Sequence, residues 1–202
     1  MKKFQYILLS LVALAGCDKF LDKMPDNRTE IDTQEKIQAL LVSAYPPTDY
    51  MLVTEFMSDN VDDYGVNNPY TDRFIDEVFA WKDVTESDNE DPESVWESSY
   101  HAIACANEAL AAIDSLSKKK DVSLDLSAER AEALLCRAYN HFILVNVFCI
   151  AYNPETSATD LGVPYMDHPE TMLNPDYERG TVAEVFPAIV SGTYNSNCPA
   201  RQ

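Results

Sequence analysis

The sequence predicts an all-α protein in which helical hairpins are joined by long irregular loops. The chain has only five glycines in 202 residues, which is few for an all-β protein with many turns. Two long segments, residues 92–117 and 127–150, repeat apolar residues at helical spacing, and a short link joins them. Two amphipathic helices with a short connection pack antiparallel as a hairpin, the unit of helical-repeat proteins.

The first helix of the domain is expected to begin at an Asp32-Thr33 cap and to stop before Pro46-Pro47. A shorter helix is expected over residues 49–58. Residues 59–91 are then rich in Asp, Asn and Tyr, with little apolar periodicity, so we expect a long stretch without secondary structure of its own. Such stretches are usually functional or disordered, and the aromatic content here argues against disorder.

The segment 92–117 carries the clearest helix signals. Asp91 is a cap, Pro92 suits the first turn, and Glu93 favours the positive end of the helix dipole. The predicted apolar face comprises Trp96, Tyr100, Ile103, Asn107, Leu110 and Ile113. We therefore predict that Trp96, Tyr100 and Ile103 belong to the structural core.

The second long helix is predicted from Ser127 to Ile150. Its apolar stripe comprises Leu134, Ala138, Phe142, Val145 and Cys149, which predicts core positions for Leu134 and Phe142. Four prolines then indicate an irregular crossing, and a capping box at residues 181–184 opens a last helix. The helix signal is lost at Ser191-Gly192, so residues 191–202 are expected to form an irregular tail.

The N-terminus has the pattern of a bacterial lipoprotein. Lys2 and Lys3 precede an apolar run, and Leu14-Ala15-Gly16 leads to Cys17, the residue that would be lipidated before cleavage. Residues 1–16 are thus expected to be a signal peptide and residues 17–30 a tether, followed by the helical domain at 31–190. The apolar run is too short to span a membrane, which takes about 20 residues.

The charge excludes one class of partner. With 34 acidic residues against 15 Lys and Arg, the net charge is −19, and such a surface repels nucleic-acid phosphates. Solubility alone explains most of the acids. We predict no nucleic-acid partner.

Cofactors, metal sites and catalysis have little support. Cys105, Cys136, Cys149 and Cys198 form no C-x-x-C pair, and free thiols are expected, with a Cys105–Cys136 disulfide as the alternative. The cluster of acids and amides in residues 83–93 lacks the glycine of an EF-hand loop, so solvated acids are favoured over calcium. The three histidines, His101, His141 and His168, fall in no H-E-x-x-H pattern, and no G-x-S-x-G is present.

The candidate ligand site lies in residues 59–81. Sugars are bound by flat aromatic rings and a few convergent polar groups, and this segment supplies Trp81, Tyr64, Tyr70, Asn67, Asn68, Asp72 and Arg73. The alternative is that Trp81 and Phe79 only fix the loop to the domain. In the helices, Arg137 is expected to pair with a carboxylate or cap a carbonyl, and Asn107 to satisfy loop backbone groups.

Five segments together resemble the SusD/RagB family of surface nutrient-binding lipoproteins. They follow the family's order over nearly the whole chain after the signal peptide: residues 17–22, 96–107, 131–142, 159–165 and 179–186. The resemblance implies tetratricopeptide-like hairpins in a lipid-anchored protein on the cell-surface side of the outer membrane. It also implies a binding protein, not an enzyme. The implied partners are an oligosaccharide or other nutrient and a TonB-dependent, SusC-like transporter.

The chain departs from the family in length. Family members are more than twice as long, and the polar tail begins where their helices would continue. The resemblance therefore predicts that this chain is an N-terminal portion left by truncation or a frameshift. The alternatives are a helical-repeat lipoprotein used only for protein docking at the outer membrane, or an inactive truncated fragment.

Overall fold

The computed structural model of the protein describes residues 30–69, 71–85, 90–118, 124–172, 175 and 177–193. The predicted signal peptide, Cys17 and residues 17–29 of the tether lie outside the described residues. The helices belong to one compact unit, residues 31–202. Their order is α3 (Gln34–Val42), α4 (Met51–Phe56), α5 (Arg73–Phe79), α6 (Pro92–Ser117), α7 (Ser127–Phe148) and α8 (Val182–Thr193), with a 3-10 turn at Gly65–Asn67.

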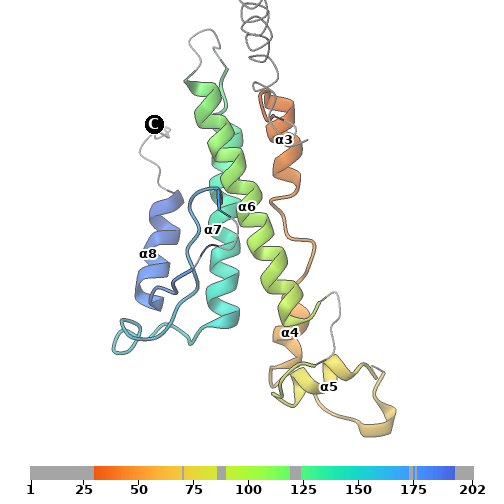
Figure 1. The fold of residues 1–202 in the computed structure, drawn as a ribbon. Coiled ribbons are helices and arrows are strands. Elements are labelled where there is room, and N and C mark those ends of the chain that lie inside the picture. Colours follow the sequence, from red (N-terminus) through yellow and green to blue (C-terminus); the bar gives the residue numbers. More distant parts are fainter. Residues whose placement is uncertain are drawn as a thin grey trace, which may run out of the picture. The chain divides into compact units, whose positions relative to one another are not determined.

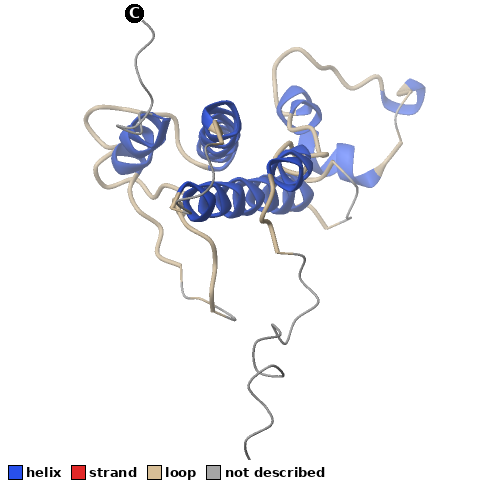
Figure 2. Ribbon diagram, turned by 90° about the horizontal axis from the view of Figure 1, so that it is seen from above, coloured by secondary structure: helices blue, strands red, loops and turns tan. Residues whose placement is uncertain are grey.

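The all-α prediction is confirmed. Among the described residues, the only β-type pairing is a single antiparallel bridge between Leu161 and Thr181. Figure 1 shows α6 and α7 running side by side as the central hairpin, with α3 beside α6 and α8 beside α7. Figure 2, seen from above, draws the described residues as helices and loops only. No helix in the described part of the chain has the length and apolar character that a membrane crossing requires.

Local cap chemistry sets the start of α6 where the sequence predicts it. The Asp91 carboxylate accepts a hydrogen bond from the Ser94 backbone N–H at 2.6 Å, and Pro92 is the first helical residue. This satisfies one of the backbone donors that a helix start leaves unpaired. The second helix of the hairpin, α7, ends at Phe148, two residues before the predicted end.

The hairpin is packed through small residues on both helices. Ala102, Ala106 and Ala109 of α6 and Ala133 of α7 are fully buried, and alanines allow two helix axes to approach closely. The bulkier residues around them include Ile103, Ile113, Leu134 and Leu144, all buried. The core predictions for Ile103 and Leu134 are therefore confirmed. Trp96 and Tyr100 are half-buried and pack against the edge of this core.

The core prediction for Phe142 is wrong, because 45% of its surface is exposed. The same helix buries Cys136, which the predicted stripe places away from the apolar face. A single stripe describes a helix with one neighbour, but α7 contacts α3, α6 and α8. Its buried surface therefore spreads around the helix and leaves Phe142 on the remaining side.

The start of α3 also follows its cap, since the Thr33 hydroxyl accepts from the Lys36 backbone N–H. A buried carboxylate fixes this helix to α7: Oε1 of Glu129 accepts from the side-chain amides of Gln34 and Gln38, both at 2.7 Å. These contacts join residues more than 90 positions apart. They place α3 on the flank of the hairpin.

The last helix begins at the predicted capping box. Oε2 of Glu184 accepts from the backbone N–H of Thr181 at 2.8 Å. Gly162 lies against this start, where an added Cβ would meet the Val185 side chain at 2.8 Å and the Thr181 carbonyl at 2.9 Å. The helix continues through Ser191-Gly192 to Thr193, so the expected loss of helix at residue 191 is wrong.

Residues 59–91 differ from the expectation as well. They contain the 3-10 turn and the two-turn helix α5, where the sequence predicts no secondary structure. The apolar residues Phe74, Ile75 and Val78 of α5 are buried together with Val53 of α4 and Val95 of α6. A helix of seven residues has too few turns for its periodicity to stand out, and it is stabilised by this tertiary contact.

Candidate functional site

The predicted loop borders a hollow of about 730 Å³. Its walls come from the end of α4, the loop and one side of α5, and they include Phe56, Asn60, Tyr64, Asn68 and Phe79. A second hollow of about 470 Å³ adjoins it, shares Phe56, Asn60 and Phe79, and adds Trp81. Both volumes lie in the range of small-molecule sites. We call the two together the loop hollow.

Local hydrogen bonds hold the loop in shape. Oδ1 of Asp63 accepts from the Gly65 backbone N–H and from the Asn68 side-chain amide, both at 2.7 Å. Oδ1 of Asn68 in turn accepts from the Tyr64 backbone N–H at 2.8 Å. Gly65 has a φ of 60°, a left-handed conformation that glycine adopts without steric cost. The side chain of Tyr64 is therefore presented by a preformed turn.

The same hydrogen bonds favour the ionised form of Asp63. The Gly65 N–H, and then the Asn68 amide, lower the pKa of Asp63. Asp62 and Asp76 also line the hollow, and none of its described lining residues is Lys, Arg or His. The wall therefore offers carboxylate acceptors and aromatic surface, which suits a neutral ligand with hydroxyl groups and disfavours an anion.

Trp81 lies directly after the C-cap residue of α5 and has an uncommon backbone conformation. Its φ is 53°, its N–H donates to the Val78 carbonyl at 3.0 Å, and the N–H of Lys82 donates to the Glu77 carbonyl at 2.9 Å. These are the two hydrogen bonds of a Schellman cap, a position at which glycine is usual. The left-handed conformation is strained for a residue with a Cβ. Nevertheless, the indole is 72% exposed, so burial of the ring does not explain the residue.

Glu77 anchors the segment after Trp81. Its carboxylate accepts from the Thr85 backbone N–H at 2.6 Å, the Thr85 hydroxyl at 2.7 Å and Arg73 Nε at 2.8 Å. The hydrogen bonds from Thr85, assisted by Arg73, lower the pKa of Glu77 to about 2. The carboxylate is thus ionised at neutral pH and bonds α5 to the chain that follows it.

The structure brings together three of the seven predicted ligand-binding residues. Tyr64, Asn68 and Trp81 line the loop hollow. Asn67 is exposed on the 3-10 turn, Asp72 is the N-cap residue of α5, and Arg73 pairs with Glu77; these three do not line it. Tyr70 lies outside the described residues.

Phe56 and Phe79 are wall residues that sequence reasoning did not propose as ligand contacts, since each sits in a short helix whose packing is set by tertiary contacts. Asp63 was also missed, although its spacing to Gly65 is a recognisable sequence signal. An Asp two residues before a glycine is typical of a side-chain turn. That signal identifies the rigid part of the loop.

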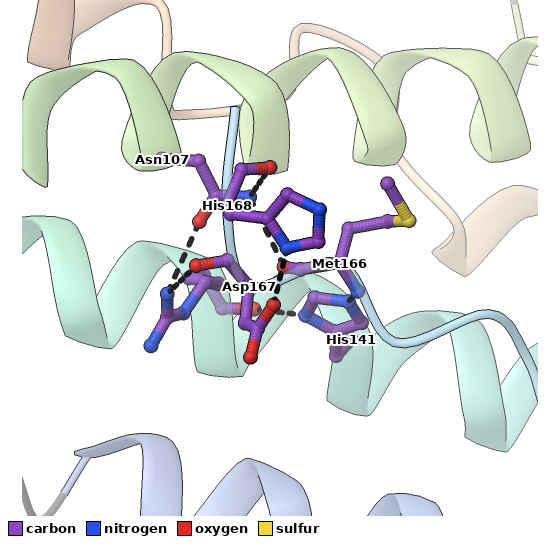
Figure 3. Close-up of polar contacts among 6 residues, drawn as sticks. Asn107, His141, Met166, Asp167 and His168 are labelled. Carbon is purple, nitrogen blue, oxygen red and sulfur yellow. Dashed lines mark hydrogen bonds and ion pairs between the residues drawn. The ribbon is translucent and has the colours of Figure 1, made fainter. Parts of the chain in front are cut away.

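A buried polar network lies away from this hollow, between α6 and α7 (Figure 3). Arg137 Nη1 donates to Asn107 Oδ1 at 3.1 Å and to the Asp167 carbonyl at 3.0 Å. The Asn107 amide donates to the carbonyls of Met166 and His168. Arg137 thus caps a carbonyl and Asn107 satisfies loop backbone groups, as the sequence predicts. Neither lines the loop hollow.

His141 completes this network. Its Nδ1 lies 2.9 Å from the Arg137 carbonyl, and its Nε2 accepts from the Met166 N–H at 3.0 Å. Because a carbonyl can only accept, Nδ1 carries the proton and the ring is neutral. Burial lowers the pKa of His141 to about 4. The network fixes the segment around residues 166–168 across the hairpin.

Cys105, Cys136 and Cys149 are free thiols, so the alternative of a Cys105–Cys136 disulfide is not realised. Burial raises the pKa of all three, which makes them poor nucleophiles at neutral pH. Within the described residues, no three His, Cys, Asp or Glu side chains gather as metal ligands. Asp88 and Asn89 of the weighed calcium cluster lie outside the described part of the chain.

Comparisons with known proteins agree with this architecture. A crystal structure of a SusD superfamily protein from Bacteroides thetaiotaomicron VPI-5482 matches with a TM-score of 0.59 and 22% sequence identity, which supports a shared fold. The match covers 79% of this chain and 36% of that one, so this chain spans little more than a third of that protein's length. No curated protein matches the chain. The SusD-like family model, described as starch-binding associating with outer membrane, matches residues 19–196, and the chain therefore belongs to the SusD-like family.

Proposed function

We propose that the protein captures a neutral oligosaccharide at the loop hollow and presents it to a TonB-dependent, SusC-like transporter in the outer membrane. The observation that carries the proposal is Trp81. An exposed indole is held in a strained left-handed conformation at the end of α5, next to a hollow walled by Phe56, Phe79 and Tyr64. Strain of this kind persists where function requires it.

The surroundings of Trp81 suit a sugar. An indole face covers the apolar side of a pyranose ring, and nearby carboxylates and amides bind its hydroxyls. Asp62, Asp63 and Asn68 supply such groups. The absence of cationic side chains from the described walls argues for an uncharged ligand. The family description as starch-binding supports the same class.

The location follows from the N-terminal sequence. Lipidation of Cys17 anchors the protein at the outer membrane, and residues 17–30 connect the anchor to the helical domain. The exported protein faces the outside of the cell, where the oligosaccharides are. Its role is binding without turnover, as the membership of the SusD-like family suggests.

Calorimetric titration with maltoheptaose, a soluble starch fragment, tests the proposal. Trp81→Ala should weaken binding by about 1–3 kcal/mol, the cost of losing an interface aromatic. Met172→Ala is the matched control, because Met172 is equally exposed but lies outside the loop hollow. Equal affinities of wild type and Trp81→Ala would move the site away from the loop hollow.

One observation favours a second candidate function, docking to another protein without ligand capture. Leu135 and Phe142 lie two turns apart on α7 and are both exposed, and exposed apolar side chains on one face are typical of interaction surfaces. Replacing both with serine should abolish co-purification with the transporter if docking is the main role. Retention of maltoheptaose binding by that variant would separate the two functions.

A further inference from the structure

A further hollow of about 370 Å³, separate from the loop hollow, lies beside the start of α4, between the α3–α4 connection and the hairpin. Three tyrosines line it: Tyr45 and Tyr50 from the connection and Tyr139 from α7. Tyr45 is 56% exposed and Tyr139 is 51% exposed, so both rings offer surface to solvent. We call this site the tyrosine hollow.

A hydrogen bond at its hydroxyl end holds the Tyr45 ring in place. The Tyr45 hydroxyl donates to Glu132 Oε1 at 2.9 Å, which ties the connection to α7. Burial, and to a lesser degree a hydrogen bond with Tyr50, raises the pKa of the Tyr139 hydroxyl. An exposed ring fixed through its hydroxyl loses little further freedom when a ligand stacks on it. The tyrosine hollow is therefore preorganised.

The lining restricts the chemistry of a ligand. Among the described residues, it contains the carboxylate of Asp49 and the hydroxyls of Thr48 and Ser99, but no Lys, Arg or His. Oδ1 of Asp49 accepts from the Met51 N–H at 2.8 Å, so the carboxylate is held at the edge. Aromatic faces next to oxygen acceptors fit a ring with one apolar side and hydroxyl groups at its rim. The small volume fits one or two such rings.

We propose that the tyrosine hollow is a second sugar-binding site, distinct from the loop hollow; the choice of a sugar rests on the proposed function. The two sites share no lining residue. Met51, the first residue of α4, lines the tyrosine hollow, whereas Phe56, the last, lines the loop hollow. Each site therefore has its own aromatic rings and can be removed separately.

The test is a titration with maltoheptaose of the wild type, Tyr139→Ala, Tyr139→Phe and Trp81→Ala, followed by calorimetry and by NMR of 13C-labelled tyrosine rings. Wild type should bind two equivalents, and Tyr139→Ala should lose one with at least a tenfold drop in affinity at that site. Tyr139→Phe keeps the ring and should stay within about threefold of wild type. Tyr45→Ala, on a different element, repeats the test should Tyr139→Ala fail to fold.

The possible results separate this inference from the proposed function. A single equivalent that Trp81→Ala removes and Tyr139→Ala leaves intact overturns the tyrosine site only. A single equivalent that Tyr139→Ala removes and Trp81→Ala leaves intact overturns the loop site and supports the tyrosine site. No binding by the wild type overturns both. Ring shifts with choline and none with maltoheptaose would show a cation site and overturn the sugar assignment.

Discussion

The central hairpin and the loop hollow are stabilised in different ways. In the hairpin, buried side chains satisfy groups far away in sequence: Arg137 and Asn107 bond to carbonyls of a segment about 30 to 60 residues later. Around the loop hollow, the polar contacts join near neighbours, as between Asp63 and Asn68 or Glu77 and Thr85. The large side chains Tyr64 and Trp81 remain exposed there.

This difference separates stability from binding. Buried polar contacts are costly to break, because the remaining partner loses its hydrogen bonds without regaining water. Exposed aromatics on short local turns cost little to replace but provide contact surface for a ligand. Substitutions in the hairpin should therefore change the free energy of unfolding, and those around the loop hollow should mainly change affinity.

The largest effect is expected from Arg137→Met. The substitution leaves Asn107 Oδ1 and the carbonyls of Asp167 and Gly192 without their donor, which should cost about 3–4 kcal/mol. Arg130→Met is the control, because Arg130 pairs with the half-exposed Asp114, and such pairs contribute less than about 1 kcal/mol. Urea unfolding measures both. Similar losses in the free energy of unfolding for the two variants would mean that the buried network stabilises the fold no more than the half-exposed ion pair does.

The next contrast tests the assignment of α7 faces. Leu144 is fully buried, whereas Phe142, two residues away, is exposed. Leu144→Ala should cost about 3 kcal/mol by leaving a cavity, and Phe142→Ala less than about 1 kcal/mol. Thermal unfolding of both variants is the measurement. A large loss of stability in Phe142→Ala would show that Phe142 belongs to the core.

The pH dependence of stability should come from His141. Its folded pKa of about 4 lies below the usual 6.5, so the neutral ring is favoured on folding. This stability is present above pH 6.5 and is lost as the pH falls toward 4. Between pH 6.5 and 5 the loss should reach about 2 kcal/mol.

The matched variant is His141→Gln, which keeps a donor and an acceptor but does not titrate. It should flatten the stability profile between pH 6.5 and 5. The lowered pKa values of Glu77 and Asp63 act at lower pH, so they do not contribute in this window. An unchanged slope in His141→Gln would assign the pH dependence to other groups.

The smallest expected effect on stability is at Trp81. Trp81→Gly should be more stable than Trp81→Ala by about 1 kcal/mol, because only the alanine keeps a Cβ in the left-handed conformation. Both variants should lose maltoheptaose binding to the same extent. Differential scanning calorimetry compares them. Equal stability would show that the conformation at residue 81 is not strained.

Part of the candidate site follows from the sequence. The composition of residues 59–81 indicates a ligand-binding loop, and the loop hollow has Tyr64 and Asn68 in one of its two parts and Trp81 in the other. Arg73 does not line it, because Glu77 is one helical turn away and takes the guanidinium. That pairing depends on α5, a helix too short to show in the pattern. The prediction failed where the secondary structure itself depended on tertiary contacts.

The sequence by itself determined the starts of α3 and α6, because their caps, Thr33 and Asp91, act on backbone groups within one turn. It also determined the all-α class and the roles of Arg137 and Asn107, whose polar groups have to be satisfied once buried. Tertiary structure alone decided the exposure of Phe142, the burial of Cys136 and the existence of α5. Each of these depends on how many neighbours pack around an element, and that number is set by residues distant in the chain.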